Sequence, residues 1–490
     1  MNIKKFIIFL IIVSTLLSLC LCACADTTPK DDNTDQEPED VSWENNNFNF
    51  NDDVITFVYV EGEQGEFTHI SIEPDEDDGD PVVTALYERN RKIEEAYHVD
   101  IEAIQGATSI SGLTSAITSS LAAGSEDYDV VAGYQYYDLG LARNGYLYDL
   151  NTLSDYGADY LHLDRDYWGT NYINALSYNN KIYWITGDIS LRYIGGMYCT
   201  FVNGDIYNKV LLDTYGSIYD VVRSGDWTID TMIAMSDAAY DDTNGSEKVD
   251  EEDRVGYVTE ICDDSEAMAI AAGVKFSKTD VDGKVTIAFK TDRTVEFCNK
   301  YYELVNSTGF LEYADASSTK SMGNFASENT LFVTNKLFQA QVYLTEMDNY
   351  YVIPLPKLNK EQADYISYLH DGCTIFGINV STDVLPAAAA TLDAMAEESH
   401  EKVSPIYYDS ALKYKYTRDN DSAEMIDLIH RTLITDFAAA WSNSISDIAH
   451  FFRTYAHSLN KITSIISKQT SKWKESLNTL LEQLDEASEL

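Results

Sequence analysis

The sequence predicts an α/β fold that contains a parallel sheet, because strand-like and helix-like stretches alternate along the chain. The first strand-like stretches, rich in β-branched and aromatic residues, lie at 55–60, 99–104 and 128–132. Between them, Asp80 and Pro81 provide an N-cap and a first-turn proline for one helix, and a second helix over 111–123 ends at Gly124. A β-α-β-α-β order favours a parallel sheet covered by helices, with ligands beyond the carboxyl ends of the strands.

The rest of the chain continues the alternation. Thr228 is a typical N-cap for a helix over 229–239. We expect further strands at 255–258, 285–289, 331–334, 350–355 and 373–380, and further helices at 294–305, 387–397 and repeatedly after 406. A chain of 490 residues is long enough for two or three domains, and it contains no apparent internal repeat.

The charge balance restricts the partners. The chain has 34 Lys+Arg against 81 Asp+Glu, which gives a formal net charge of −47. Such a surface repels phosphate backbones, so we expect no nucleic-acid binding. The 35 Tyr outnumber the 18 Phe and 6 Trp together, and tyrosine offers both an apolar face and a hydroxyl to wet, polar ligands.

The amino terminus indicates export. Residues 1–23 combine Lys4 and Lys5 with an apolar stretch that is shorter than the ~20 residues of a spanning helix. The segment that ends at Ala23-Cys24 resembles the lipobox of bacterial lipoproteins, which implies a signal peptide over 1–23 and a lipid on Cys24. Cys22 fits less well because Leu21 precedes it. The alternative is an uncleaved membrane anchor.

Residues 24–53 are predicted to be an acidic tether between the lipid and the folded body. Positions 25–53 carry ten acidic residues and one lysine without apolar periodicity, which is typical of a solvated segment. The alternative is an acidic metal-binding tail.

Four cysteines remain in the body, and they form no CxxC or Cys/His cluster that would indicate zinc or thiol-redox chemistry. They could form two disulfides or stay reduced. Each lies in an apolar stretch, so we expect buried, free thiols at Cys199, Cys262, Cys298 and Cys373.

Several short strings between about residues 54 and 440 occur in the order found in the solute-binding proteins of bacterial ABC importers. The chain resembles the sugar-binding branch that is related to maltose-binding protein. The matching strings are Tyr128-Asp129-Val130-Val131, Gly145-Tyr146-Leu147-Tyr148-Asp149-Leu150, Asn180-Lys181-Ile182-Tyr183, Gly187-Asp188, Phe201-Val202-Asn203, Gly225-Asp226-Trp227-Thr228, Ile353-Pro354-Leu355-Pro356-Lys357 and Lys415-Tyr416-Thr417-Arg418-Asp419.

This resemblance implies a two-lobe fold of the periplasmic-binding-protein type II class, in which hinge strands join discontinuous lobes. The lobes would comprise 54–188 with 357–398 and 195–354 with 403–490. The chain would first cross between Asp188 and Gly196. The ligand would bind in the cleft between the lobes and close it.

Carbohydrates are bound by aromatic faces and by carboxylates or amides that accept hydroxyl protons. The loop after the third strand offers Tyr134, Gln135 and Tyr136 where ligands bind in such a sheet, although a tyrosine-rich surface loop is the plainer interpretation. Trp168 is a further aromatic candidate, but a tryptophan is also a common core residue.

The crossing segments supply the remaining candidates. Asp188, Arg192 and Tyr193 lie in the first crossing, where a carboxylate would face the cleft; the alternative for Asp188 is a helix cap. Phe338 follows a predicted strand in the region where relatives carry a stacking ring, and Asp371 precedes the strand that returns to the first lobe.

An acidic stretch at 242–253 resembles the Ca²⁺ loop of EF-hands, because oxygen-bearing groups recur at the spacing that can surround one ion. Glu247 replaces the usual turn glycine, and a merely solvated acidic loop is the alternative. We expect a structural Ca²⁺ and no other cofactor. The predicted ligands are Asp242, Asn244, Ser246, the carbonyl of Lys248, Asp250 and Asp253.

Together these features predict a lipid-anchored receptor at the extracellular face of the cell membrane that delivers a carbohydrate to the permease of an ABC transporter. We expect a monomer that is not an enzyme, since no GxSxG, HExxH, P-loop or GxGxxG motif stands in a matching context. The alternatives are a surface lipoprotein that holds or hydrolyses glycans, and a receptor for peptides or metal chelates.

Overall fold

The computed structural model describes residues 42–60, 63–74, 79–313, 319–413 and 420–487. The chain divides into a unit over Met1–Asn45 and a compact unit over Asn46–Leu490. The first contributes only the short 3-10 helix η1 (Trp43–Asn45) to the described part. The predicted signal peptide, Cys24 and most of the predicted tether lie outside the described residues, as does the string 415–419. Among the described helices, none has the length and apolar character needed to cross a membrane.

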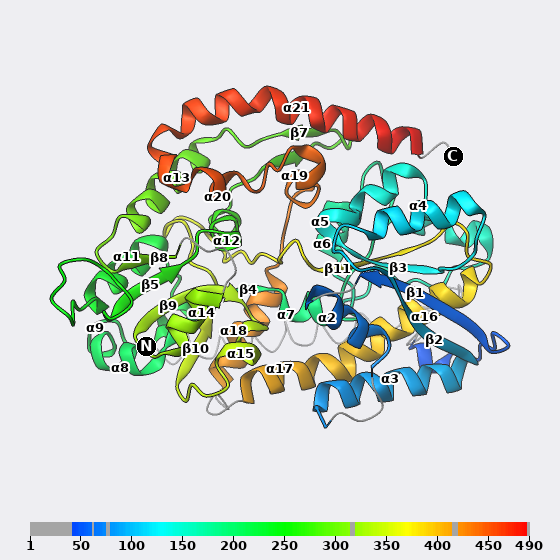
Figure 1. Cartoon of the computed structure of the whole chain (residues 1–490), viewed down its shortest axis with the longest axis horizontal. Coiled ribbons are helices and arrows are strands. Elements are labelled where there is room, and N and C mark those ends of the chain that lie inside the picture. The colour runs from blue at the N-terminus through cyan, green and yellow to red at the C-terminus, as the bar shows by residue number, and fades with distance from the viewer. Residues whose placement is uncertain (1–41, 61–62, 75–78, 314–318, 414–419, 488–490) are drawn as a thin grey trace, which may run out of the picture. The chain divides into compact units, whose positions relative to one another are not determined.

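The first lobe of the compact unit is built on a four-stranded sheet in the order β11-β3-β1-β2 (Figure 1). β1 runs parallel to both neighbours, with Phe57 opposite Ala103 on β2 and opposite Val130 on β3, whereas β11 runs antiparallel to β3. This confirms the predicted parallel β-α-β-α-β order. The strands are β1 (Asp53–Val60), β2 (Val99–Ala107), β3 (Val130–Tyr134) and β11 (Thr374–Ile378).

Helices cover this sheet, and the predicted caps determine their ends. The Asp80 carboxylate accepts from the backbone N–H groups of Val82 and Val83, and Gly124 ends the next helix with a positive φ of 67°. The helices of this lobe are α2 (Glu63–Ile72), α3 (Pro81–Tyr97), α4 (Leu113–Ala123), α5 (Gln135–Asp138), η2 (Leu139–Asn144), η3 (Leu150–Tyr156), α6 (Thr170–Leu176) and α16 (Leu385–Glu398).

The second lobe is built on a five-stranded mixed sheet in the order β10-β4-β9-β5-β8. β9, β5 and β8 are parallel neighbours, so their carboxyl ends meet at one edge. The strands are β4 (Tyr198–Asn203), β5 (Val255–Thr259), β8 (Phe310–Glu312), β9 (Thr330–Lys336) and β10 (Tyr350–Ile353), with a separate hairpin of β6 (Ser277–Thr279) and β7 (Val285–Ile287).

The helices of the second lobe flank this sheet, and Thr228 caps one of them as predicted by accepting from the N–H of Thr231. They are α8 (Gly204–Val210), α9 (Leu212–Tyr215), α10 (Ile218–Arg223), α11 (Ile229–Ala239), α12 (Asp263–Ala271), α13 (Asp292–Val305), α14 (Thr319–Ala326), α15 (Gln339–Tyr343) and α18 (Asn420–Arg431).

Crossing segments connect the two lobes. The short helix α7 (Leu191–Gly195) leads towards β4, and just before that strand Met197 pairs with Leu369 of the returning chain; Ser367 pairs with Leu433. After α16 the chain continues through the π-helical turn η4 (Ser399–Val403) and α17 (Ser404–Lys413).

The carboxy-terminal segment contacts both lobes. Trp473 of the long helix α21 packs edge-on against Phe289 and Phe451, and Asp485 near its end accepts from Asn179 of the first lobe at 2.9 Å. Figure 1 shows this helix in red above both sheets. The segment comprises α19 (Phe437–Ala440), η5 (Ser442–Ile445), α20 (Phe451–Tyr455), η6 (Ala456–Lys461) and α21 (Ile462–Ala487).

The four body cysteines are free, as predicted. Cys199, Cys298 and Cys373 are buried, and burial raises the pKa of each thiol. Cys262 differs from the expectation because it is partly exposed at the edge of a pocket described below.

Candidate binding site

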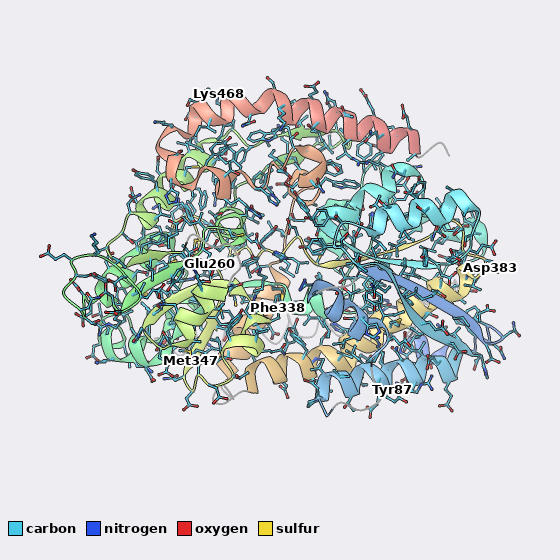
Figure 2. All side chains as sticks on the ribbon, in the orientation of Figure 1. Tyr87, Glu260, Phe338, Met347, Asp383 and Lys468 are labelled. Carbon is cyan, nitrogen blue, oxygen red and sulfur yellow. The ribbon has the colours of Figure 1, made fainter. Side chains whose placement is uncertain are left out.

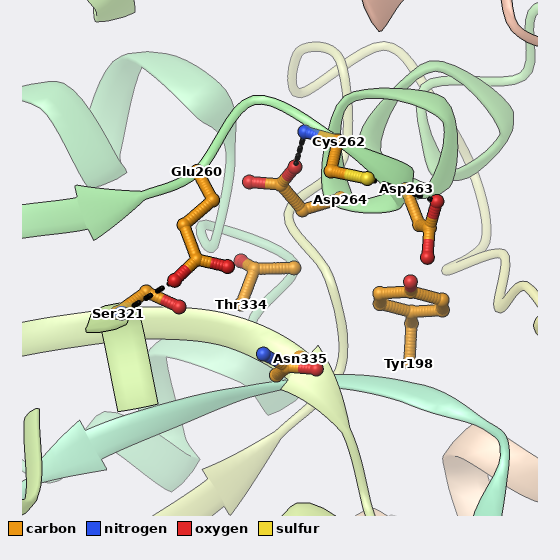
Figure 3. Close-up of a pocket in the computed structure, with 8 residues that line it drawn as sticks. All are labelled: Tyr198, Glu260, Cys262, Asp263, Asp264, Ser321, Thr334 and Asn335. Carbon is orange, nitrogen blue, oxygen red and sulfur yellow. Dashed lines mark hydrogen bonds between the residues drawn. The ribbon is translucent and has the colours of Figure 1, made fainter. Parts of the chain in front are cut away.

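A small polar pocket lies at the carboxyl ends of β5 and β9, the edge where ligands bind in parallel sheets (Figure 3). Its free volume of about 10 Å³ holds roughly one water molecule. Three carboxylates, one aromatic ring and short polar groups surround it. The lining residues are Tyr198, Glu260, Cys262, Asp263, Asp264, Ser321, Thr334 and Asn335.

Glu260 is the least satisfied carboxylate of this pocket. Its side chain is 7% exposed, and Oε1 accepts from the backbone N–H of Ser321 at 2.8 Å. Its other oxygen, Oε2, is buried without a hydrogen-bond partner among the described residues. A buried acceptor without a donor is costly, so this oxygen is suited to a hydroxyl or N–H donor from a ligand.

Asp264 is fully held by its own loop. Its carboxylate accepts from the backbone N–H groups of Cys262 and Ser265 at 2.8 and 2.9 Å, and from the hydroxyl of Thr259. Burial nevertheless raises its pKa to about 6. Asp264 therefore helps to fix the start of α12 and leaves less capacity for a ligand than Glu260 does.

Asp263 is the centre of an ion-pair cluster beside the pocket. His370 Nε2 lies 2.8 Å and Lys336 Nζ 3.4 Å from its Oδ2, and Arg453 Nη2 lies 2.8 Å from its Oδ1. Burial alone would raise the pKa of Asp263, but these three groups hold it well below the usual range. Arg453 also binds the buried Glu266 through two hydrogen bonds, at 2.5 and 2.8 Å.

The same cluster continues to the first lobe through Asp371. His450 Nε2 lies 3.2 Å from Asp371 Oδ2, and the Tyr136 ring stacks on His450 at 4.9 Å and 16°. The Tyr136 hydroxyl donates to Asp447 at 2.6 Å. Burial opposes the shift, yet the hydrogen bond from His450 lowers the pKa of Asp371, and the bond to Asp371 raises the pKa of His450. These contacts join the two lobes beside the small pocket.

Of the predicted site residues, Tyr134, Tyr136 and Asp371 lie in or next to this cluster. Tyr134 ends β3, with its ring 5.5 Å from that of Tyr137, and burial raises the pKa of its hydroxyl. Gln135 is adjacent but 1% exposed, and its amide donates to the carbonyl of Ala440 at 3.2 Å.

Asp188 lies elsewhere, within the crossing. It is 3% exposed, with Oδ2 2.6 Å from His400 Nδ1 and Oδ1 3.6 Å from His430 Nε2. Burial would raise the pKa of Asp188, but the two histidines lower it, and the hydrogen bond that His400 donates to Asp188 raises the pKa of His400.

Arg192, Tyr193 and Phe338 accompany Asp188 in the crossing rather than lining the pocket at β5. The guanidinium of Arg192 lies 5.6 Å from the centre of the Phe338 ring, and the Tyr193 ring meets His430 edge-on at 5.9 Å. Phe338 and Glu260 both belong to the second lobe, with Phe338 nearer to the first (Figure 2).

Trp168 packs inside the first lobe. It is 2% exposed, and its indole N–H donates to Asp393 at 3.2 Å. The same carboxylate accepts from the hydroxyl of Tyr167 at 3.1 Å and lies 2.5 Å from His162 Nδ1. Trp168 therefore shares a buried acceptor on α16 with its neighbours.

Most of the predicted Ca²⁺ loop is exposed; Asp242 and Asp250 are half-buried, and only Asp253 is buried. Asp242 Oδ1 accepts from the backbone N–H of Gly245, and Asn244 donates to Asp250 at 3.0 Å. Asp253 is fully buried and accepts from the N–H of Thr243. The remaining predicted ligands bind one another, since Ser246 donates to the carbonyl of Lys248 at 2.9 Å.

Glu247, at the turn position of this loop, has a left-handed backbone with φ 59°, the conformation for which EF-hand loops use glycine. In the described part of the chain, no group of three or more His, Cys, Asp or Glu side chains is arranged to hold a metal ion. Ca²⁺ binding stays a prediction.

Comparison with solved structures identifies the fold. An ABC substrate-binding protein from Listeria monocytogenes in complex with cycloalternan matches with a TM-score of 0.53 and 14% identity, over 89% of this chain and 99% of that one. UgpB from Mycobacterium tuberculosis in complex with glycerophosphocholine matches with a TM-score of 0.52 and 14% identity, over 88% of this chain and 98% of that one. A sugar transporter from Rhizobium etli in an open conformation matches with a TM-score of 0.54 and 12% identity, over 87% of this chain and 99% of that one.

The chain has the fold of ABC substrate-binding proteins. This confirms the predicted α/β two-lobe class. The match extends over nearly the whole length of these neighbours. No protein-family model matches the chain. No curated protein matches it in sequence.

None of the residues that the second lobe contributes to the small pocket was predicted from the sequence. Glu260 and Asp263 directly follow a strand that was predicted correctly, and the same carboxyl-end rule used for the first lobe would have selected them. His450 and Arg453 carry no comparable signal, because they join the cluster from a helical region almost two hundred residues further along the chain.

Proposed function

We propose that the protein is a lipid-anchored extracellular receptor that captures a carbohydrate and delivers it to the permease of an ABC transporter. The fold supports a role in ligand capture. Two of the neighbouring structures are described as a complex with cycloalternan and as a sugar transporter. A third is a complex with glycerophosphocholine, so the fold by itself does not select the ligand.

The unpartnered carboxylate oxygen of Glu260 is the main support for a carbohydrate ligand. Its buried Oε2 has no donor among the described residues, and it faces a pocket that also contains the Tyr198 ring and the amide of Asn335. Carboxylates and amides that accept from hydroxyl groups, next to an aromatic face, suit a sugar. We infer that the lobes separate to admit the ligand, whose hydroxyl groups then take the place of the present contacts between the lobes.

A thermal-shift screen tests this function. The mature protein is heated with mono- and oligosaccharides, peptides, metal chelates and glycerophosphocholine, and each mixture is chromatographed afterwards. We expect stabilisation by a carbohydrate that is recovered unchanged. Hydrolysis products would instead indicate a glycan-degrading lipoprotein, and stabilisation only by a non-carbohydrate would reject the sugar assignment.

We propose Cys24 as the lipidation site, in line with the lipobox-like segment before it. Replacing Cys24 by Ala should yield a protein without lipid that is no longer retained at the membrane, whereas Cys22→Ala should be lipidated normally. Loss of lipid from Cys22→Ala but not from Cys24→Ala would assign the anchor to Cys22.

A further inference from the structure

A second hollow of about 330 Å³ lies between the lobes, away from the pocket at Glu260. One wall is α6 of the first lobe, where Asn171 and Asn174 present their amides. The opposite wall is the segment from the end of α12 to β6, with Lys275 and Lys278. We call this hollow the groove. Its volume lies within the range of small-molecule sites, which is about 300–1,000 Å³.

The groove contains two ammonium groups, those of Lys275 and Lys278, beside the amides of Asn171 and Asn174, which both donate and accept. Its one carboxylate, Asp436, already accepts from the backbone N–H groups of Phe276 and Ser277 at 2.7 and 3.0 Å and from the Ser277 hydroxyl at 2.7 Å. It also caps α19 through N–H groups of that helix. The acceptor capacity of Asp436 is therefore used by the protein, and its one negative charge stands against the two positive charges of Lys275 and Lys278.

Lys275 and Lys278 are exposed, and neither takes part in an ion pair within the described part of the chain. In a protein of net charge −47, two lysines without carboxylate partners beside two amides form a local site for negative charge. The floor of the groove is apolar, with Ile366, Ile434 and Phe437. A ligand that fits both parts carries an anionic group and an apolar portion.

We propose that the groove binds a small organic anion with an apolar portion, such as a phosphate monoester or a free carboxylate of an aromatic or aliphatic group. The ammonium and amide groups would hold the anion, and the isoleucines and Phe437 would cover the apolar part.

The position of the groove links it to the cleft, a part of the inference that rests on the proposed function. The returning chain lines the groove at Ile366 and reaches the cleft cluster at Asp371, about 16 Å further along an extended segment. The paired crossing at Met197 and Leu369 lies between them. We infer that a rotation about this crossing changes the width of both openings; the present structure combines the paired cleft with a groove of about 330 Å³. An anion in the groove therefore favours the closed cleft and raises the affinity for the solute.

Calorimetric titration with phenyl phosphate tests the groove. We expect saturable binding to the wild-type protein, no binding of the neutral benzyl alcohol, and a loss of about tenfold in affinity for each lysine removed in Lys275→Gln/Lys278→Gln. The control Lys472→Gln/Lys474→Gln removes the same charge from exposed positions of α21 outside the groove, and it should retain wild-type affinity. Equal affinity in the two double variants, or no saturable binding to the wild type, would overturn the proposal.

The coupling is measured by titrating the carbohydrate identified in the thermal-shift screen with and without phenyl phosphate. We expect several-fold tighter carbohydrate binding with phenyl phosphate in the wild type and in the control, and no change in Lys275→Gln/Lys278→Gln. Unchanged carbohydrate affinity in the wild type would overturn the coupling. If no carbohydrate binds at all, the proposed function fails, while the phenyl phosphate titration still decides whether the groove is an anion site.

Discussion

The cleft and the groove differ in how their charges are satisfied. On the cleft side, Asp263, Asp371 and their histidine, lysine and arginine partners are paired within 3.4 Å, and the adjacent pocket holds about 10 Å³. On the groove side about 330 Å³ is open, and its lysines have no such partners in the described structure. The protein satisfies its own charges in the cleft, so we expect a ligand there to compete with these ion pairs or to join them.

Among the variants considered, removal of Arg453 should cause the largest loss in the free energy of unfolding, because it disrupts the ion pairs of the cleft. Arg453→Met removes one of the three basic partners of Asp263 and the ion-pair partner of the 1%-exposed Glu266, and loss of one partner of a buried ion pair costs about 3 kcal/mol. Urea unfolding measures this cost. The control Arg223→Met removes an exposed arginine from its partners Asp421 and Glu424 and should cost less. An equal loss in both variants would contradict the view that the cleft cluster is structurally special.

The loop at 242–253 differs from the cleft cluster, because its carboxylates have no cationic side chain among their described hydrogen-bond partners. If it binds Ca²⁺, a hundredfold excess over the dissociation constant stabilises the fold by about 2.7 kcal/mol. Calorimetric melting in millimolar Ca²⁺ and in EDTA measures the shift, which Asp242→Ala should remove. The same melting temperature in both buffers for the wild type would mean that the loop is only solvated.

Replacement of Glu260 tests the one pocket carboxylate that keeps an unused acceptor. Glu260→Gln retains the size of the side chain but weakens acceptance from ligand hydroxyl groups, so carbohydrate affinity should fall about tenfold. The exposed Glu361→Gln removes the same charge elsewhere in the chain and serves as the control in the titration. Unaltered affinity in Glu260→Gln would place the ligand elsewhere.

The Asp188–His400 pair should give the smallest effect, visible as a dependence on pH. The raised pKa of His400 means that its contribution to stability is fully present below its unfolded pKa near 6.5 and is lost as the pH rises through the higher folded value. The difference in melting temperature between the wild type and His400→Gln should therefore be larger at about pH 6 than at about pH 9. A difference that grows with pH would contradict the pairing.

The sequence predicted the sheets better than it predicted the site, and particular residues explain why. Asp80, Gly124 and Thr228 act through neighbours within a few positions, so local patterns were sufficient to place helix ends. The burial of Trp168 against Asp393, and the position of Asp188 between two histidines from later helices, depend on contacts more than 200 residues apart. Such contacts follow from the packing of the lobes, which no local pattern encodes.

The central claim is that the cleft beside Glu260 binds a carbohydrate without altering it. Titration calorimetry of the mature wild-type protein with the best carbohydrate of the screen, followed by chromatography of the mixture, tests this claim most directly. We expect saturable binding of one carbohydrate per chain and full recovery of the intact sugar. Failure of every carbohydrate to bind, or the appearance of cleavage products, would contradict it.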